Sequence, residues 1–167
     1  MIKRLFLLFT ICFIACALQA QENAIYHNIA NGYSIQYPNS WEIEDDQDNE
    51  TVSIYKQNQD SDIQTHIQIS VALWEDGSLD EFVRAIHLED MNDLYAGFSI
   101  KERNQEENKC MYEVSYILND VRVNSIFYFL QMEEQIFIFL AMAEDSENYE
   151  SDKEIFINII ESIEFQN

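Results

Sequence analysis

Most of the chain after residue 32 consists of segments with the length of a β-strand. In some of these segments apolar and polar residues alternate, and in others the apolar residues are consecutive. Within 63–73 every second residue is apolar or a threonine, which predicts a long strand with one buried face. Asn119-Asp120 and Glu133-Glu134 mark tight connections between the last three runs. The predicted strands are 33–37, 41–43, 51–55, 63–73, 98–101, 110–118, 121–132 and 134–142.

Two segments show helical spacing instead. Ser78, followed three residues later by Glu81, forms a capping box and predicts a helix from Ser78 to near Tyr95. A second helix is predicted to begin between 146 and 151 and to end near Ser162, followed by a short strand at 163–165. Its apolar face is formed by Ile155, Phe156, Ile159, Ile160 and Ile163. The predicted order of elements is several strands, a helix, a meander of antiparallel strands and a second helix. This order predicts an α+β domain, in which an antiparallel sheet is flanked by helices.

The first twenty residues have the pattern of a secretory signal peptide. Lys3-Arg4 is basic, residues 5–17 are mostly apolar, and small residues follow up to Ala20. The apolar run is shorter than the ~20 residues that a spanning helix needs. We therefore predict cleavage between Ala20 and Gln21. Residues 21–167 would form a single domain without a transmembrane span, exported to the periplasm or the extracellular space.

A second cellular location, attachment to the envelope, remains open. Phe13-Ile14-Ala15-Cys16 is similar to a bacterial lipobox, whose cysteine is acylated and becomes the new N-terminus. Acylation at Cys16 would anchor the protein to the envelope by a lipid. Leu18-Gln19-Ala20 only approximates the A-x-A cleavage pattern, but phenylalanine is not the favoured first residue of a lipobox. We favour plain cleavage, with the lipoprotein as the alternative.

The net charge of the chain limits the classes of partner that it can bind. The 31 acidic residues outnumber the nine basic ones, and loss of Lys3 and Arg4 with the signal would change the net charge from −22 to −24. Such a surface repels phosphate backbones and anionic headgroups, so we predict no nucleic-acid partner. A protein partner with a basic face fits this charge. Loss of the signal would also leave Cys110 as the sole cysteine, which we interpret as a buried, inert thiol.

Signals for catalysis are absent from the sequence. The chain has no G-x-S-x-G motif, no glycine-rich phosphate loop and none of the common zinc spacings. His27, His66 and His87 stand far apart in the sequence. We therefore predict no catalytic residues, no cofactor and no enzymatic activity.

One acidic segment has the spacing of a cation site. Asp46, Asp48 and Glu50 place carboxylates at alternate positions, which suits a hard cation such as calcium. Thr51 stands where an EF-hand loop has its glycine. These three residues are weak metal candidates, and a solvated hairpin tip is the competing interpretation.

The segment Gly32-Tyr33-Ser34-Ile35-Gln36-Tyr37-Pro38-Asn39-Ser40-Trp41 resembles the opening G-F-x-I-x-Y-P-x-x-W of PsbP-like domains. That family is named after an extrinsic subunit of photosystem II and shares its fold with the Mog protein. The similarity in layout covers about 24–166. It implies an α/β/α sandwich, with Tyr37, Pro38 and Trp41 as residues that define the fold. It also implies a scaffold for protein–protein contacts without a shared catalytic constellation.

These observations predict an exported, non-enzymatic binding or accessory protein of the cell envelope that acts through an acidic contact surface. Two alternatives stay open. The protein could be an immunity or inhibitor protein against a basic toxin, since acidic inhibitors use electrostatic steering. It could instead bind calcium or a small apolar ligand, because the aromatic residues that alternate along 127–139 form either sheet core or the lining of a pocket.

Overall fold

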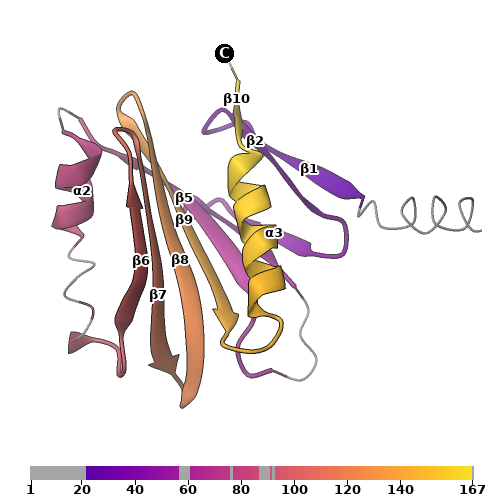
Figure 1. Cartoon of the computed structure of the whole chain (residues 1–167). Coiled ribbons are helices and arrows are strands. Elements are labelled where there is room, and N and C mark those ends of the chain that lie inside the picture. Colours follow the sequence, from indigo (N-terminus) through magenta and orange to yellow (C-terminus); the bar gives the residue numbers. More distant parts are fainter. Residues whose placement is uncertain (1–21, 57–60, 76, 87–90, 92, 167) are drawn as a thin grey trace, which may run out of the picture.

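The computed structural model describes residues 22–56, 61–75, 77–86, 91 and 93–166. This part of the chain contains two antiparallel sheets and two helices (Figure 1). The strands are β1 (Asn23–Asn28), β2 (Tyr33–Pro38), β3 (Glu42–Asp46), β4 (Thr51–Tyr55), β5 (His66–Leu73), β6 (Ser99–Gln105), β7 (Lys109–Leu118), β8 (Val121–Met132), β9 (Gln135–Glu144) and β10 (Glu164–Phe165). The helices are α2 (Leu79–Ala85) and α3 (Tyr149–Glu161).

The elements form three layers. Seven strands make the larger sheet in the order β3-β4-β5-β9-β8-β7-β6, and three make a smaller sheet in the order β1-β2-β10. Helix α2 lies on one face of the larger sheet, whereas α3 and the smaller sheet lie on the other (Figure 1). The prediction of an α+β fold, with an antiparallel sheet flanked by helices, is confirmed.

Strand alternation divides the apolar residues between the two faces. On β8, Phe129 packs with Phe82 of α2, while Ile126 and Leu130 belong to the core beneath α3. The α3 core also contains Phe139 of β9 and Phe156 of α3, both almost fully buried. Each large side chain of this kind stabilises the fold by about 1.5–3 kcal/mol when it leaves water.

The local structures that the sequence predicts, a capping box and a tight turn, are present. The Ser78 hydroxyl accepts a hydrogen bond from the Glu81 amide, and the Glu81 carboxylate accepts one from the Ser78 amide, so the capping box is complete. Asn119 and Asp120 both adopt positive φ, 51° and 64°, which suits the two-residue connection of β7 to β8. Helix α3 begins at Tyr149, within the predicted window.

Helix α2 is shorter than predicted. It ends at Ala85 rather than near Tyr95, and residues 87–90 and 92 lie outside the described part. Leu94, which the helical pattern placed on the apolar face, is 76% exposed. Acidic residues follow at Glu89, Asp90 and Asp93, and carboxylates disfavour a helix C-terminus because of its partial negative charge.

Strand boundaries also differ from the prediction. β5 begins at His66 rather than at residue 63, although Ile63 and Thr65 are buried as the pattern indicated. Leu73, placed on the buried face, is 73% exposed because it ends the strand. β6 is longer than the predicted 98–101, and β1 was not predicted at all.

Residues 1–21 lie outside the described part of the chain. This applies to the predicted signal segment 1–20, to its cleavage site between Ala20 and Gln21, and to Cys16. Among the described residues, no helix has the length and hydropathy needed to cross a membrane.

Candidate functional site

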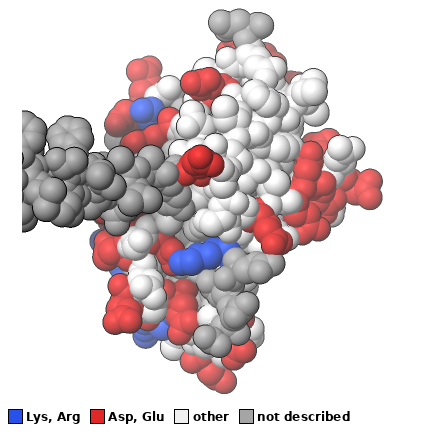
Figure 2. Space-filling model, turned by 90° about the vertical axis from the view of Figure 1, so that its right-hand side faces the viewer, with Lys and Arg blue, Asp and Glu red and all other residues white. Residues whose placement is uncertain are grey.

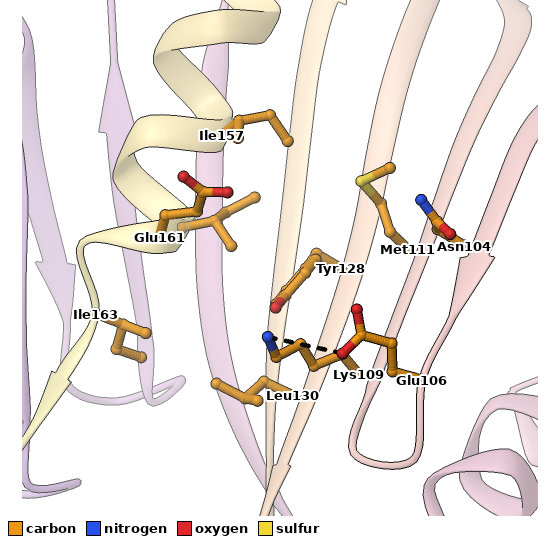
Figure 3. Close-up of a pocket in the computed structure, with 10 residues that line it drawn as sticks. Asn104, Glu106, Lys109, Met111, Tyr128, Leu130, Ile157, Glu161 and Ile163 are labelled. Carbon is orange, nitrogen blue, oxygen red and sulfur yellow. Dashed lines mark ion pairs between the residues drawn. The ribbon is translucent and has the colours of Figure 1, made fainter.

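An open groove lies on the α3 side of the larger sheet, where α3 does not extend over β6 and β7 (Figure 3). Its volume is about 590 Å³, within the range of ligand sites. Met111 of β7 and Tyr128 and Leu130 of β8 form the floor. These three residues point to the α3 face because strand neighbours alternate, so only every second residue of each strand reaches the groove.

Isoleucines from α3 and the residues after it form the facing wall. Ile157 and Ile160 lie on α3, and Ile163 follows the end of the helix. Ile157 is half-buried and points from α3 over the neighbouring strands (Figure 3). A partner that covers this wall would remove apolar surface from water, worth roughly 25 cal/mol per Å² before association costs.

The rim of the groove is polar and carries two carboxylates, one ammonium group and one amide. Glu161 lies on the α3 wall, and Glu106 lies at the opposite side, 3.9 Å from Lys109. Both members of this ion pair are exposed, so the pair is weak and can open when another cation approaches Glu106. The groove thus combines an apolar interior with two carboxylates that favour a positively charged group.

Tyr128 supplies a polar group at the centre of the floor. Burial raises the pKa of its hydroxyl, and the nearby charges of Glu106 and Glu161 raise it further. The hydroxyl therefore keeps its proton at neutral pH. No described residue accepts a hydrogen bond from it, so this donor is available to a carbonyl or carboxylate of a bound molecule.

A second cluster of polar side chains joins the start of α3 to the sheet. Glu113 of β7 is only 6% exposed and accepts hydrogen bonds from the Tyr149 hydroxyl, at 3.1 Å, and from the Lys153 ammonium. Because burying an unpaired carboxylate is costly, both donors are needed to keep Glu113 in the core. The cluster fixes the first turn of α3, which in turn positions the groove wall.

A bulge in β6 extends this cluster to the sheet edge. The register with β7 shifts between Ile100 and Glu102, which directs Lys101 toward the α3 face. Its ammonium donates to Asn124 Oδ1 at 2.7 Å and lies 5.7 Å from the Tyr149 ring centroid. The Asn124 amide donates to Asp145 at 2.8 Å. Each polar group in this chain of contacts has a partner, which is typical of a structural network rather than a reactive site.

Alkaline pH is expected to destabilise the protein. Burial raises the pKa of Tyr33 to about 12, burial and the Glu113 charge raise that of Tyr149, and the hydrogen bond to Glu113 raises that of Lys153. Folding therefore holds these protons, so their stabilisation is complete below the ordinary values near 10 and is lost as pH rises through the folded values. Urea unfolding between pH 8 and 11.5 should show a falling free energy, with a shallower fall in Tyr149→Phe. A flat profile would contradict this assignment.

The cation candidates lie at the β3–β4 hairpin. The Asp46 carboxylate accepts hydrogen bonds from the amides of Asp48 and Asn49, at 3.1 and 3.2 Å, and from the Asn49 side chain at 2.7 Å. The Asn49 bonds lower the pKa of Asp46. Glu50 has a φ of 54° and follows the turn. No three metal-ligating side chains cluster within the described ranges, and cation binding stays a prediction.

The residues of the resemblance motif lie in and beside the α3 core. Pro38 ends β2, and its carbonyl accepts a hydrogen bond from the Trp41 amide at 2.9 Å, which turns the chain toward β3. Trp41 is 5% exposed and packs edge-on against Phe156 at 5.9 Å. Tyr37 is half-buried against the same core. Their positions fit a structural role.

Nucleophile and base candidates do not come together. His27 lies on β1 at one end of the molecule, and His66 lies on β5 with its Nδ1 2.9 Å from the Gln64 carbonyl. His87 lies outside the described residues. Cys110 is buried, and burial raises the pKa of its thiol, which disfavours the reactive thiolate.

Sequence reasoning anticipated one part of the groove: of the aromatic residues along 127–139, Tyr128 lines it, whereas Phe129, Phe137 and Phe139 are buried in the sheet core. The other lining residues were not predicted. The walls of the groove come from residues 104–111, 128–130 and 157–163, and no local spacing relates these segments. One signal was present at Ile157, an isoleucine outside the predicted apolar face of the last helix. A single apolar residue on the polar side of a helix is common and does not by itself indicate a binding site, so this signal was weak.

Solved structures with a similar fold are known. Cyanobacterial PsbP (CyanoP) from Synechocystis sp. PCC 6803 is 15% identical with a TM-score of 0.61, and the match covers 87% of this chain and 93% of that one. LpqN from Mycobacterium tuberculosis, described as involved in cell envelope biogenesis, is 14% identical with a TM-score of 0.56, covering 87% and 91%. The protein PA94 from Pseudomonas aeruginosa, described as a putative regulator, is 11% identical with a TM-score of 0.52, covering 80% and 90%.

At these identities the similarity concerns the fold alone. The chain has a PsbP-like α+β fold, as the resemblance of residues 32–41 implied. No protein-family model and no curated protein matches the sequence. The function must therefore be argued from the groove and the charge around it.

Proposed function

We propose that this protein is a non-enzymatic binding protein of the cell envelope, and that the groove between α3 and β6–β8 holds a segment of a partner protein. The observation that carries this proposal is the open apolar groove of about 590 Å³ in a chain with a net charge of −22. The envelope role ascribed to LpqN and the predicted signal peptide support the location.

The lining determines which segment fits. Apolar side chains of the partner would contact Met111 and Ile157, which are half-buried, and would displace water from their apolar surface. Lysine or arginine residues beside them would meet Glu106 and Glu161 at the rim. A backbone carbonyl would accept the proton of Tyr128. The remaining carboxylates of the surface would steer a basic partner toward the groove and raise the association rate.

Groove variants test this proposal. Residues would be replaced in the host, and the partner would be captured by mild cross-linking in cells. Ile157→Lys and Glu161→Lys are expected to reduce the yield of the main cross-linked partner at least tenfold, because the first removes apolar surface and the second inverts a rim charge. Glu75→Lys is the matched control, since it makes the same charge change at an exposed residue outside the groove. Capture from the wild type should weaken as salt rises.

Two results would contradict the proposal. Equal capture by Ile157→Lys and by the wild type would show that the partner binds elsewhere. A small molecule that remains bound to the wild type in native mass spectrometry, and is lost in Ile157→Lys, would make the groove a small-ligand site. The apolar lining favours this second candidate among the alternatives, because the volume of the groove is in the range of small-molecule sites.

A further inference from the structure

Strand β1 is an unprotected sheet edge. Proteins usually protect edges with charged residues, proline, bulges or very short strands, since an exposed edge can pair with another chain. The other edges among the described strands are protected: β3 has four acidic residues in five, β6 has charges and a bulge, and β10 has two residues. β1 is Asn-Ala-Ile-Tyr-His-Asn, six residues without charge or proline, and among the described strands it pairs with β2 alone.

The chain segment that contains β1 and the turns on either side of β2 is also free of charge. Residues 23–41 contain no Asp, Glu, Lys or Arg, although 24% of the whole chain is charged. Two isoleucines are exposed there, Ile25 at 58% and Ile29 at 85%. Figure 2 faces the side on which β1 lies and shows an uncharged area whose border carries carboxylates and, at its lower edge, a basic side chain. Exposed apolar residues on an uncharged area with a charged border are typical of an interaction site.

A hollow lies where the second half of β1, with the turn after it, faces the β3–β4 hairpin. This hollow of about 630 Å³ is lined by Tyr26, His27 and Ile29 on one side and by Asp45 and Glu50 of the β3–β4 hairpin on the other. The Tyr26 hydroxyl donates to Asp45 at 2.7 Å and joins the two sides. A chain that enters the hollow would have the β1 backbone along one side and carboxylates along the other.

We propose that the β1 edge binds an extended segment of another protein by strand addition, a mode in which backbone hydrogen bonds supply affinity and alternate side chains supply specificity. Apolar residues of the segment would contact Ile25 and Ile29. Basic residues would face Asp45 and Glu50. A second copy of this chain fits less well, because it would bring a further set of these carboxylates to the same edge.

This inference does not depend on the proposed function. The groove lies at the β6–β8 end of the larger sheet, whereas β1 and the β3–β4 hairpin lie at the other end. Two separate sites would allow two segments of one partner, or two partners, to bind at the same time. Simultaneous engagement raises the overall affinity through effective concentration.

The test uses a labelled peptide of alternating valine and lysine and the mature exported protein. Saturable binding is expected in fluorescence anisotropy, with amide shifts in β1 by nuclear magnetic resonance. The control peptide has the same sequence with alternate backbone amides methylated, so its charge and side chains are unchanged. It should bind at least tenfold more weakly, because the added strand loses its donors.

Variants separate this site from the groove. Ile25→Lys introduces an edge charge at a position that is 58% exposed and should weaken peptide binding at least tenfold. Leu94→Lys, at a leucine that is 76% exposed, and Ile157→Lys should not. Equal binding of the two peptides, or shifts that map outside β1, would overturn the proposal. Concentration-dependent dimerisation that Ile25→Lys abolishes would also overturn it and assign the edge to a second copy.

Discussion

Replacement of Lys153 by methionine is expected to lower the free energy of unfolding by about 3 kcal/mol, because the substitution leaves the Glu113 carboxylate buried with one donor instead of two. Glu113 has a 7% exposed side chain, and Lys153 donates to one of its oxygens. Tyr149 still donates to the other oxygen at 3.1 Å, which limits the loss to the lower end of the range for broken buried pairs. Urea denaturation at pH 7, followed by circular dichroism, measures the change.

Two companion variants make this result interpretable. The double replacement Lys153→Met and Glu113→Leu should recover most of the loss, since removing both charges leaves no uncompensated ion. Arg84→Met breaks the exposed pair of Arg84 with Asp80 and should cost only about 0.5 kcal/mol. If Lys153→Met is no more harmful than Arg84→Met, Lys153 does not stabilise the buried carboxylate.

Replacement of Trp41 by alanine is expected to cost about 3–5 kcal/mol, the usual range for truncation of a large buried aromatic residue. Trp41 connects the turn after β2 to α3 through its edge-on contact with Phe156. Alanine would leave a cavity at this junction and remove an aromatic pair worth about 0.5–1.5 kcal/mol beyond its buried area. Chemical denaturation followed by circular dichroism reports the loss without depending on tryptophan emission.

Trp74 provides the matched control. It is only partly buried and packs against Phe82 on the α2 side, 5.3 Å between ring centroids. Its indole N–H is buried without a hydrogen-bond partner in the described part of the chain, so truncation of this residue also removes an unfavourable feature. Trp74→Ala should therefore cost clearly less than Trp41→Ala. Equal decreases in the free energy of unfolding for the two variants would show that Trp41 does not stabilise the contact between the turn after β2 and α3.

Much of the fold was predictable because its signals are local. The capping box at Ser78 and the turn at Asn119-Asp120 depend on contacts within a few residues. The strand 121–132 was predicted with the bounds of β8, since its long apolar run between two turn signals leaves little choice. The segment 32–41 indicated the PsbP-like fold because its signals are also local. A strand, a proline turn and a tryptophan that packs back into the core follow one another directly in the sequence.

Errors occurred where packing overrode the local pattern. The apolar stripe beyond Ala85 predicted more helix, yet the following acidic residues oppose the negative end of the helix dipole. β1 has weak strand propensity, with two asparagines and an alanine among its six residues, and forms because β2 offers it a partner. The bulge at Lys101 depends on the register with β7 and has no signature in the sequence of β6.

The periodicity of the elements, most of their order, the acidic charge and the likeness to PsbP-like domains can be derived from the amino-acid sequence, because these properties reside in neighbouring residues or in composition. Which side chains meet depends on the tertiary structure. The groove joins residues as distant as Asn104 and Ile163, and the buried Glu113 meets Lys153 forty positions away. Such contacts depend on strand register and on where α3 crosses the sheet, and both follow from the packing of the whole chain.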